Sequence, residues 1–425
     1  MTQGHLHKFR IVYLTLCATL FWHAPVFAEQ HSIKAGDTDI GVQVYPAKGK
    51  LILLWQPHEA GIQSGDQHLA EELAARGIEV WILDLLEDYF LPNTANNMDR
   101  LPPEAFAAVI AAAAGTGKYV IAASSGRGAI PVLRGIRQWQ LTQPTETALL
   151  GTVLVSPKLF TETPDPGMAG QLMPIASATN QTIVLLQPDK SPWYWKLDQT
   201  LAGLQQGGSD VYLWPLQNAR DRFYFRPDAS EREKQMGDRL ATYLHTAIRL
   251  LQNQGVQRRQ AVALTQTAPV VPEGKKEHVL AKYKGDPQPP PLRLPDVHGA
   301  MIDLNDFKGY VVLVNFWATW CPPCVHEMPS MQRLAEHFKG KRFTILGVNM
   351  AEDAGSVTEF VRQRVRVTFP IVLDKDGQAL KAWRVFAFPT SYVIDKRGQI
   401  RYALFGGIDW DTADVKHKLS TLLAE

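Results

Sequence analysis

Cysteine is scarce in this chain, which has three among 425 residues. So few cysteines exclude the dense disulfide framework of a small secreted scaffold. Neither sign of charge is in large excess either, because the chain has 44 basic and 42 acidic residues and a formal net charge of +2. The chain therefore lacks the basic surface that nucleic-acid binding needs, and we expect no nucleic-acid partner.

Long apolar runs are missing too, and the one near the N-terminus is short. It extends from Ile11 to about Trp22, after two basic residues, and a small residue, Ala28, follows it. This run is too short for a comfortable membrane span, and the pattern is typical of a secretory signal. We expect 1–28 to be a cleaved signal peptide, with an uncleaved membrane anchor as the alternative. The mature protein would then be periplasmic or otherwise extracytoplasmic and would not span the membrane.

Removal of the signal would leave only two of the cysteines. Cys17 would leave with the signal, and Cys321 and Cys324 would remain. A disulfide in this Cys-x-x-Cys spacing closes almost no loop and adds little stability, so the spacing favours redox chemistry. A zinc site would need further ligands. We therefore expect no metal or organic cofactor besides a redox-active Cys321–Cys324 disulfide.

The order of apolar and amphipathic segments predicts two α/β domains. Over 29–252, short apolar runs alternate with helical patterns, which predicts a doubly wound parallel sheet covered on both faces. Residues 253–291 are polar and end in a proline-rich stretch, which is typical of a semi-rigid linker. A second domain follows over 292–425, with an apolar strand at Val311–Trp317 and a helix from Pro322.

The two cysteines stand where this strand gives way to the helix. Unpaired backbone N–H groups and the positive end of the helix dipole lie at such a position, and they lower the pKa of a thiol. Pro322 suits the first helical turn, because the N–H that it lacks would have no partner there. We predict that Cys321 attacks a substrate disulfide and that Cys324, one turn inside the helix, resolves the mixed disulfide. An inert disulfide or two free thiols are the alternatives.

Several short motifs in the second domain are specific. They are Trp320-Cys321-Pro322-Pro323-Cys324, Glu327 with Pro329, Gly347-Val348-Asn349, and Phe388-Pro389-Thr390. With them, the segment resembles the TlpA/ResA/CcmG group of membrane-facing, extracytoplasmic thioredoxins. The resemblance implies a thioredoxin fold and dithiol–disulfide exchange with protein clients. It also implies a reducing direction, electrons from a membrane thiol carrier, and service in cytochrome c maturation or copper-site assembly.

The same resemblance implies roles for residues around the cysteines. Glu327 would tune their protonation, since a nearby carboxylate disfavours a thiolate and can relay a proton; a surface glutamate is the alternative. Pro389 would follow a cis peptide and pack against the disulfide. Trp320, Phe388 and Thr390 would contribute to client binding, and the backbone of Phe388 would pair with an extended client segment.

A peroxiredoxin is the nearest alternative enzyme for this domain. Its chemistry needs a Pro-x-x-x-Thr/Ser-x-x-Cys loop around a single peroxidatic cysteine. Asn315, and not a proline, lies four residues before Thr319, and a Cys-x-x-Cys pair fits that chemistry badly.

The first domain contains a serine motif, Ala122-Ala123-Ser124-Ser125-Gly126-Arg127-Gly128, after a predicted strand. It is similar to the nucleophile elbow of α/β-hydrolases, with Ser124 as the nucleophile and Asp189 in the place of the acid. No histidine occurs in 217–222, after the last predicted strand, and a serine without a base is a poor nucleophile. We therefore predict a degenerate α/β-hydrolase-like domain, in which Ser124 can equally be a helix N-cap. An active esterase with an accessory thioredoxin, or a client-binding module fused to a reductase, are the alternatives.

Overall fold

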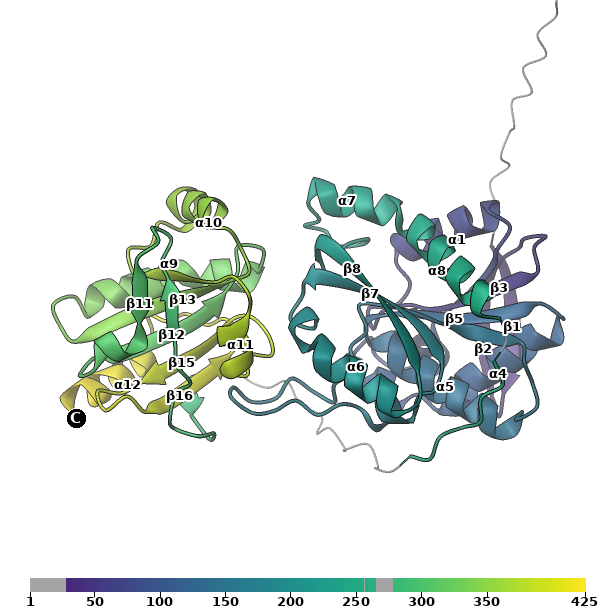
Figure 1. The fold of residues 1–425 in the computed structure, drawn as a ribbon, viewed down its shortest axis with the longest axis horizontal. Helices are drawn as coiled ribbons and strands as arrows, with labels where there is room; N and C mark the ends of the chain where they lie inside the picture. The colour runs from purple at the N-terminus through teal and green to yellow at the C-terminus, as the bar shows by residue number, and fades with distance from the viewer. Residues whose placement is uncertain (1–27, 256, 265–277) are drawn as a thin grey trace, which may run out of the picture.

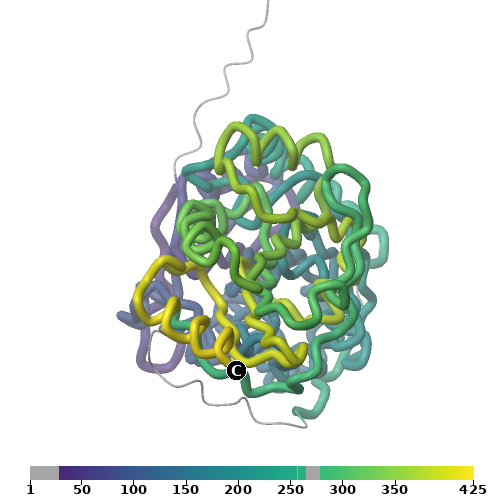
Figure 2. The backbone as a smooth tube through the Cα atoms, turned by 90° about the vertical axis from the view of Figure 1, so that its left-hand side faces the viewer, coloured from purple at the N-terminus to yellow at the C-terminus, as the bar shows by residue number. Residues whose placement is uncertain are grey.

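The computed structural model describes residues 28–255, 257–264 and 278–425. The expected signal peptide, with Cys17, lies outside them apart from Ala28. The described residues form two α/β domains that lie side by side (Figure 1). Seen from one end, the second domain stands in front of the first (Figure 2). None of the helices in the described ranges combines the length and the apolar character that crossing a membrane requires.

The first domain is built on an eight-stranded sheet in the order β1-β2-β4-β3-β5-β6-β7-β8. Strand β2 runs antiparallel to β1 and β4, and the pairs from β4 to β8 are parallel. The strands are β1 (Glu29–Ala35), β2 (Thr38–Tyr45), β3 (Leu51–Gln56), β4 (Glu79–Leu83), β5 (Tyr119–Ser125), β6 (Leu149–Val155), β7 (Thr182–Lys190) and β8 (Asp210–Arg220). Strands β3 and β6 are buried at every residue, as the continuous apolar runs of a covered parallel sheet require.

Helices cover both faces of this sheet, which agrees with the predicted α/β architecture. They are α1 (Ser64–Ala75), α2 (Leu85–Asp88), α3 (Ala95–Arg100), α4 (Pro103–Gly115), α5 (Ala129–Thr142), α6 (Leu197–Gln206), α7 (Glu231–Asp238) and α8 (Leu240–Gln254). Helices α1 and α8 share one apolar cluster with the sheet, and α4 and α5 contribute to another.

The second domain has a six-stranded sheet in the order β14-β13-β12-β15-β16-β9. Its strands are β9 (Ala281–Lys282), β12 (Val311–Trp317), β13 (Phe343–Met350), β14 (Ile371–Asp374), β15 (Thr390–Ile394) and β16 (Ile400–Phe405), and a hairpin of β10 (Arg293–Pro295) and β11 (Met301–Asp303) precedes β12. Its helices are α9 (Pro322–His337), α10 (Ala354–Phe360), α11 (Gln378–Ala382) and α12 (Ala413–Ala424). A parallel β12–α9–β13 unit is joined to the antiparallel β15–β16 pair, which is the predicted thioredoxin fold.

Part of the expected linker 253–291 is built into the domains. Ala281 and Lys282 pair with β16 and form the edge of the second sheet. Upstream, Arg259 binds the first domain, where its Nη1 donates to the carbonyl oxygen of Asn180 at 2.6 Å. These residues of the expected linker find backbone partners on each domain, which composition alone does not reveal.

Candidate active site

The two cysteines of the second domain form a disulfide at the amino end of α9. Cys321 is the N-cap residue, and its Sγ accepts a hydrogen bond from the backbone N–H of Cys324 at 3.3 Å. Cys321 is 5% exposed, whereas Cys324 is 0% exposed. The sulfur that is open to attack and also stabilised by the helix start is therefore that of Cys321.

A carboxyl group lies buried behind the disulfide. Glu327 is 3% exposed, so it is not the surface glutamate of the alternative interpretation. Its Oε1 accepts a hydrogen bond from Asn315 Nδ2 at 2.8 Å, and its Oε2 accepts one from Trp410 Nε1 at 3.0 Å. Burial raises the pKa of Glu327 to about 7, although the hydrogen bonds from Trp410 and Asn315 oppose this rise. A carboxyl with this pKa can accept and return a proton near neutral pH.

A cavity of about 480 Å³ opens beside this carboxyl. Pro323, His326 and Glu327 line it from α9, and Gly407 and Ile408 line it from the segment after β16. The cavity gives the buried Glu327 a short route for proton exchange with solvent.

The loop before β15 lies next to the tryptophan that precedes the disulfide. The peptide between Phe388 and Pro389 is cis, which confirms the expected isomer. The ring of Phe388 meets the ring of Trp320 edge to face, with centroids 5.7 Å apart. Thr390 is buried, and its hydroxyl donates to the carbonyl oxygen of Ala387 at 2.7 Å. The structure thus brings Trp320 and Phe388 together, whereas the Thr390 side chain is directed to its own loop.

Sequence reasoning missed several partners of this site. Asn315 is a buried polar residue inside the apolar strand β12, and this contrast is the sequence signal that could have identified it. Glu352 accepts a hydrogen bond from the backbone N–H of Thr319 at 2.8 Å and one from Asn349 Nδ2 at 2.8 Å. Trp410 comes from a distant segment, and no local pattern marks it.

The serine motif of the first domain differs from the expected elbow. Ser124 lies within β5 and is 0% exposed, and its Oγ has no hydrogen-bond partner among the described residues. The sharp turn falls at Gly126, whose φ is +56°, a value that glycine adopts without strain. The interpretation of Ser124 as a helix N-cap is therefore wrong, because the strand continues to Ser125. Asp189 accepts a hydrogen bond from the backbone N–H of Ala219 at 3.3 Å.

An ionic cluster fills the space over this turn. A Cβ on Gly126 would lie 2.3 Å from Cδ2 of His58, so no side chain fits there. His58 Nε2 lies 2.9 Å from Glu59 Oε2, and Lys158 Nζ donates to Glu59 Oε1 at 2.6 Å. Burial lowers the pKa of His58 to about 4. The structure places His58 beside the turn and in contact with Arg222, whose Nε lies 3.0 Å from His58 Nε2.

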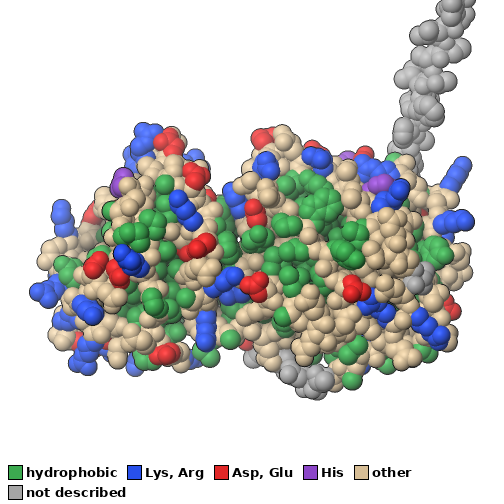
Figure 3. Space-filling model, in the orientation of Figure 1, with side chains coloured by type: hydrophobic (Ala, Val, Ile, Leu, Met, Phe, Trp, Pro, Cys, Tyr) green, Lys and Arg blue, Asp and Glu red, His purple; other side chains and the backbone are tan. Residues whose placement is uncertain are grey.

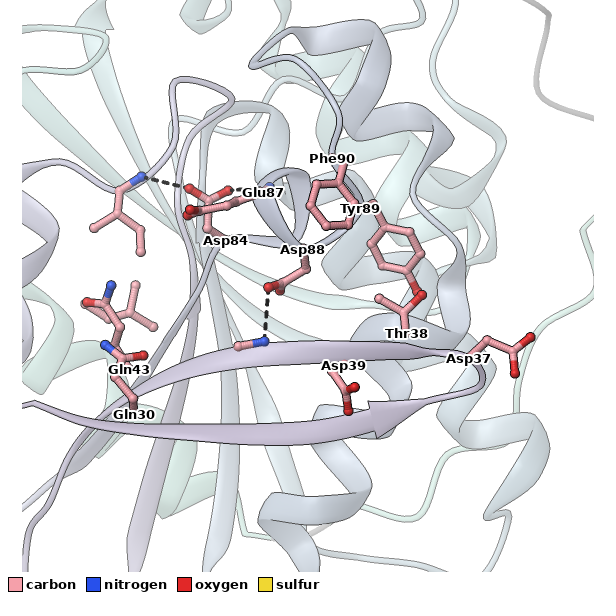
Figure 4. A pocket seen from close by; sticks show the side chains of 13 residues that line it. Gln30, Asp37, Thr38, Asp39, Gln43, Asp84, Glu87, Asp88, Tyr89 and Phe90 are labelled. Carbon is pink, nitrogen blue, oxygen red and sulfur yellow. Dashed lines mark hydrogen bonds between the residues drawn. The ribbon is translucent and has the colours of Figure 1, made fainter.

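A separate cavity of about 850 Å³ lies against the β1–β2 hairpin and α2 (Figure 4). Its lining is acidic, with Asp84, Glu87 and Asp88 on one side, and Asp88 Oδ1 accepts a hydrogen bond from the backbone N–H of Gly41 at 3.0 Å. Burial raises the pKa of Asp88 to about 6. This cavity includes no cysteine and is not part of the redox site. Within the described ranges, no three His, Cys, Asp or Glu side chains are grouped so that they could hold a metal ion.

The thioredoxin sheet, the disulfide at a helix start and the cis proline before β15 define a thiol–disulfide oxidoreductase. A model of the AhpC/TSA family matches residues 285–403, which include both cysteines. The chain is 41% identical over 117 residues to the thiol-disulfide oxidoreductase ResA of Geobacillus kaustophilus (strain HTA426). The matched residues cover 28% of this chain and 67% of that protein. It is 37% identical over 133 residues to ResA of Geobacillus thermodenitrificans (strain NG80-2), covering 31% of this chain and 75% of that protein. The chain belongs to the ResA family of thiol–disulfide oxidoreductases.

Other relatives are covered less fully. The chain spans 60% of the length of ResA from Bacillus thuringiensis subsp. konkukian (strain 97-27), at 42% identity. Among solved structures, a thiol:disulfide interchange protein of the thioredoxin family from Chlorobium tepidum TLS is 26% identical, with a TM-score of 0.30. That comparison covers 33% of this chain and 99% of the other.

Proposed function

We propose that the protein is an extracytoplasmic protein-disulfide reductase, in which Cys321 and Cys324 pass two electrons to disulfides of protein clients. The observation that carries the proposal is the disulfide at the start of α9, with Cys321 nearer the surface and the carboxyl of Glu327 buried behind it. The signal-like N-terminus supports the extracytoplasmic location.

The reaction has two exchange steps. The Cys321 thiolate attacks a client disulfide, so a bond forms between Cys321 Sγ and one client sulfur while the client S–S bond breaks, and the second client sulfur takes up a proton. Glu327 then accepts the proton of Cys324, and the resulting thiolate attacks Cys321 Sγ. The mixed disulfide breaks, the client leaves as a dithiol, and the Cys321–Cys324 disulfide forms again. A membrane thiol carrier would return the two electrons.

Trapping of the mixed disulfide tests this order of attack. In Cys324→Ser, the second step is blocked, so a covalent adduct between Cys321 and the client should accumulate in cells and disappear with a reductant. Cys321→Ser is the matched control and should trap no client through Cys324, which is fully buried. Equal trapping by both variants, or trapping by Cys321→Ser alone, would contradict the assigned roles.

The reducing direction belongs to the same proposal, with cytochrome c maturation or copper-site assembly as the pathway served. Reductants of this kind have low reduction potentials, whereas strong oxidants lie near about −120 mV. Redox equilibration of the full-length protein with glutathione measures this value. A potential in the strongly oxidising range would overturn the reducing direction, and the exchange chemistry itself would stand.

We further propose that the first domain is an α/β-hydrolase-like domain without a working triad. The strand order supports it, with an antiparallel strand β2 at the edge of a parallel series and a sharp turn after β5. The buried Ser124 and the cluster around His58 argue against ester hydrolysis at this place. A hydrolytic activity towards p-nitrophenyl esters that is lost in Ser124→Ala would overturn this interpretation.

A further inference from the structure

The first domain contacts the second on two segments that border Cys321. One is the residue directly before it, since Nη1 of Arg220 donates to the carbonyl oxygen of Trp320 at 3.3 Å. Arg220 ends β8 and is itself fixed by Glu233, to which its Nε and Nη2 donate at 2.8 and 2.6 Å. Strands β7 and β8 end on the side that faces the second domain (Figure 1), so the carboxyl end of β8 lies next to the residue before Cys321.

The other contact is made by an aromatic residue three positions before the cis proline. Phe386 is only 4% exposed. Its ring lies 5.2 Å from the ring of Phe160 and 6.4 Å from that of Trp193, and Lys196 Nζ lies 4.3 Å from its centroid. The fit is tight at the backbone as well, because a Cβ added to Gly170 would lie 2.0 Å from Cζ of Phe386.

Additional contacts surround this aromatic one. Lys381 Nζ donates to Asp198 Oδ2 at 3.0 Å, and Arg384 Nη1 donates to the carbonyl oxygen of Gly167 at 3.3 Å. The ring of Trp195 lies against Gly377 of the second domain. In the face shown in Figure 3, the two lobes meet along most of their common side. These contacts join the two domains around Phe386.

The first domain thus borders one side of the segments next to Cys321. The first domain donates a hydrogen bond to the backbone carbonyl of Trp320, and it packs against the buried ring of Phe386. Pro322 and Pro323 are exposed and Phe388 is partly exposed. Trp320 is partly exposed as well, so a client disulfide can reach Cys321 past these four residues, on the side that the first domain leaves open.

We propose that the first domain is a fixed wall of the client site, which admits disulfides on short or extended segments and excludes disulfides held in folded proteins. This inference rests on the proposed reductase function and names its substrate class. The first domain would act by excluding folded proteins from Cys321. It would therefore change the ratio of the rates for folded and for short substrates, and it would leave the rate of the exchange chemistry itself unchanged.

A wedge between the domains tests the proposal in the full-length protein. Gly170→Trp places a large side chain against Phe386 without changing the second domain. The matched control is Gly115→Trp, because Gly115 is exposed on α4 and an added Cβ there meets nothing within 4 Å. The readouts are the rates at which the reduced protein reduces oxidised glutathione and the disulfides of folded insulin.

We expect Gly170→Trp to raise the insulin rate by about tenfold or more and to leave the glutathione rate within about twofold of the original protein. Gly115→Trp should change neither rate. An unchanged ratio of insulin to glutathione rates in a folded Gly170→Trp variant would overturn the wall. If the original protein reduced neither substrate, the proposed reductase function would fail instead, and the two failures are thus distinguishable.

A second variant keeps the test decisive if the wedge prevents folding. Trp195→Ala removes a partly exposed side chain that packs on Gly377 of the second domain. It should raise the insulin rate selectively, as the wedge does. Circular dichroism establishes that the variant is folded, and an unchanged ratio of rates in that folded variant would overturn the proposal.

Discussion

Trp410 Nε1 donates a hydrogen bond of 3.0 Å to Oε2 of Glu327, although the two residues lie 83 positions apart in the chain. Asn315 binds the other carboxyl oxygen from the strand that leads to the cysteines. The two N–H donors favour the charged carboxylate, and burial favours the neutral acid. Their balance holds the pKa of Glu327 at about 7, and in the proposed reaction a carboxyl with this pKa takes the proton of Cys324.

Glu327 makes the stability of the oxidised second domain depend on pH. Because burial raises its pKa from 4.5 to about 7, the folded state holds the proton more tightly than the unfolded state does. The contribution of Glu327 to the free energy of unfolding is therefore largest below about pH 4.5 and falls by up to about 3 kcal/mol as the pH rises through about 7. Glu327→Gln should abolish this loss. Urea denaturation of the oxidised protein, followed from about pH 5 to about pH 8, measures it.

The control for this prediction lies on the same helix. Glu336 is exposed on α9, so Glu336→Gln should keep the pH dependence of the original protein. The prediction fails if Glu327→Gln and the original protein lose the same free energy of unfolding over this range.

Removal of the tryptophan donor should move the titration of Glu327 further from its ordinary value. Trp410→Phe deletes a hydrogen bond to the charged form, so the pKa of Glu327 should rise above about 7. The infrared band of the protonated carboxyl, which Glu327→Gln identifies, should persist to higher pH. Trp383→Phe is the control, because Trp383 is also buried but its Nε1 has no hydrogen-bond partner among the described residues. A carboxyl titration that is the same in both variants would contradict the role of Trp410.

The second domain could be predicted from the sequence more fully than the first. Its motifs are local, so the strand at Val311–Trp317, the helix from Pro322 and the disulfide follow from a few neighbouring residues. The carboxyl partners could not be predicted, because Asn315, Glu327 and Trp410 meet only after the chain has folded.

The first domain shows where pattern reasoning is weak. Residues 211–214 form a short apolar run, which predicts a strand of that length, whereas β8 continues to Arg220. Most residues of this edge strand are at least partly exposed, so its continuation carries no apolar signal. Helical spacing over 230–251 predicts one helix, but the structure has two that meet at Arg239. At the serine motif, the residue with a left-handed backbone conformation is Gly126, and only the backbone geometry reveals this.

The two adjacent serines of β5 should respond in opposite ways to alanine. The Ser124 hydroxyl is buried without a partner, so Ser124→Ala removes an unsatisfied group and should be neutral or raise the stability by about 1 kcal/mol. Ser125 is also buried, but its side chain hydrogen-bonds with Tyr224, and Ser125→Ala should lower the stability by about 1 kcal/mol. Thermal unfolding of the two variants measures the difference. A loss in Ser124→Ala as large as that in Ser125→Ala would show that Ser124 has a partner.

His58 should give the first domain a pH dependence opposite to that of the second. Burial lowers the pKa of His58 from 6.5 to about 4, so the unfolded state binds its proton more readily than the folded state does. Stability from His58 is therefore present above about pH 6.5 and is lost, by up to about 3 kcal/mol, as the pH falls through about 4. His58→Asn should reduce this acid sensitivity, and exposed His68→Asn should not. Calorimetry at about pH 5 and about pH 7 measures the unfolding transition of the first domain. If this transition loses as much stability at about pH 5 in His58→Asn as in the original protein, His58 is not the source of the acid sensitivity.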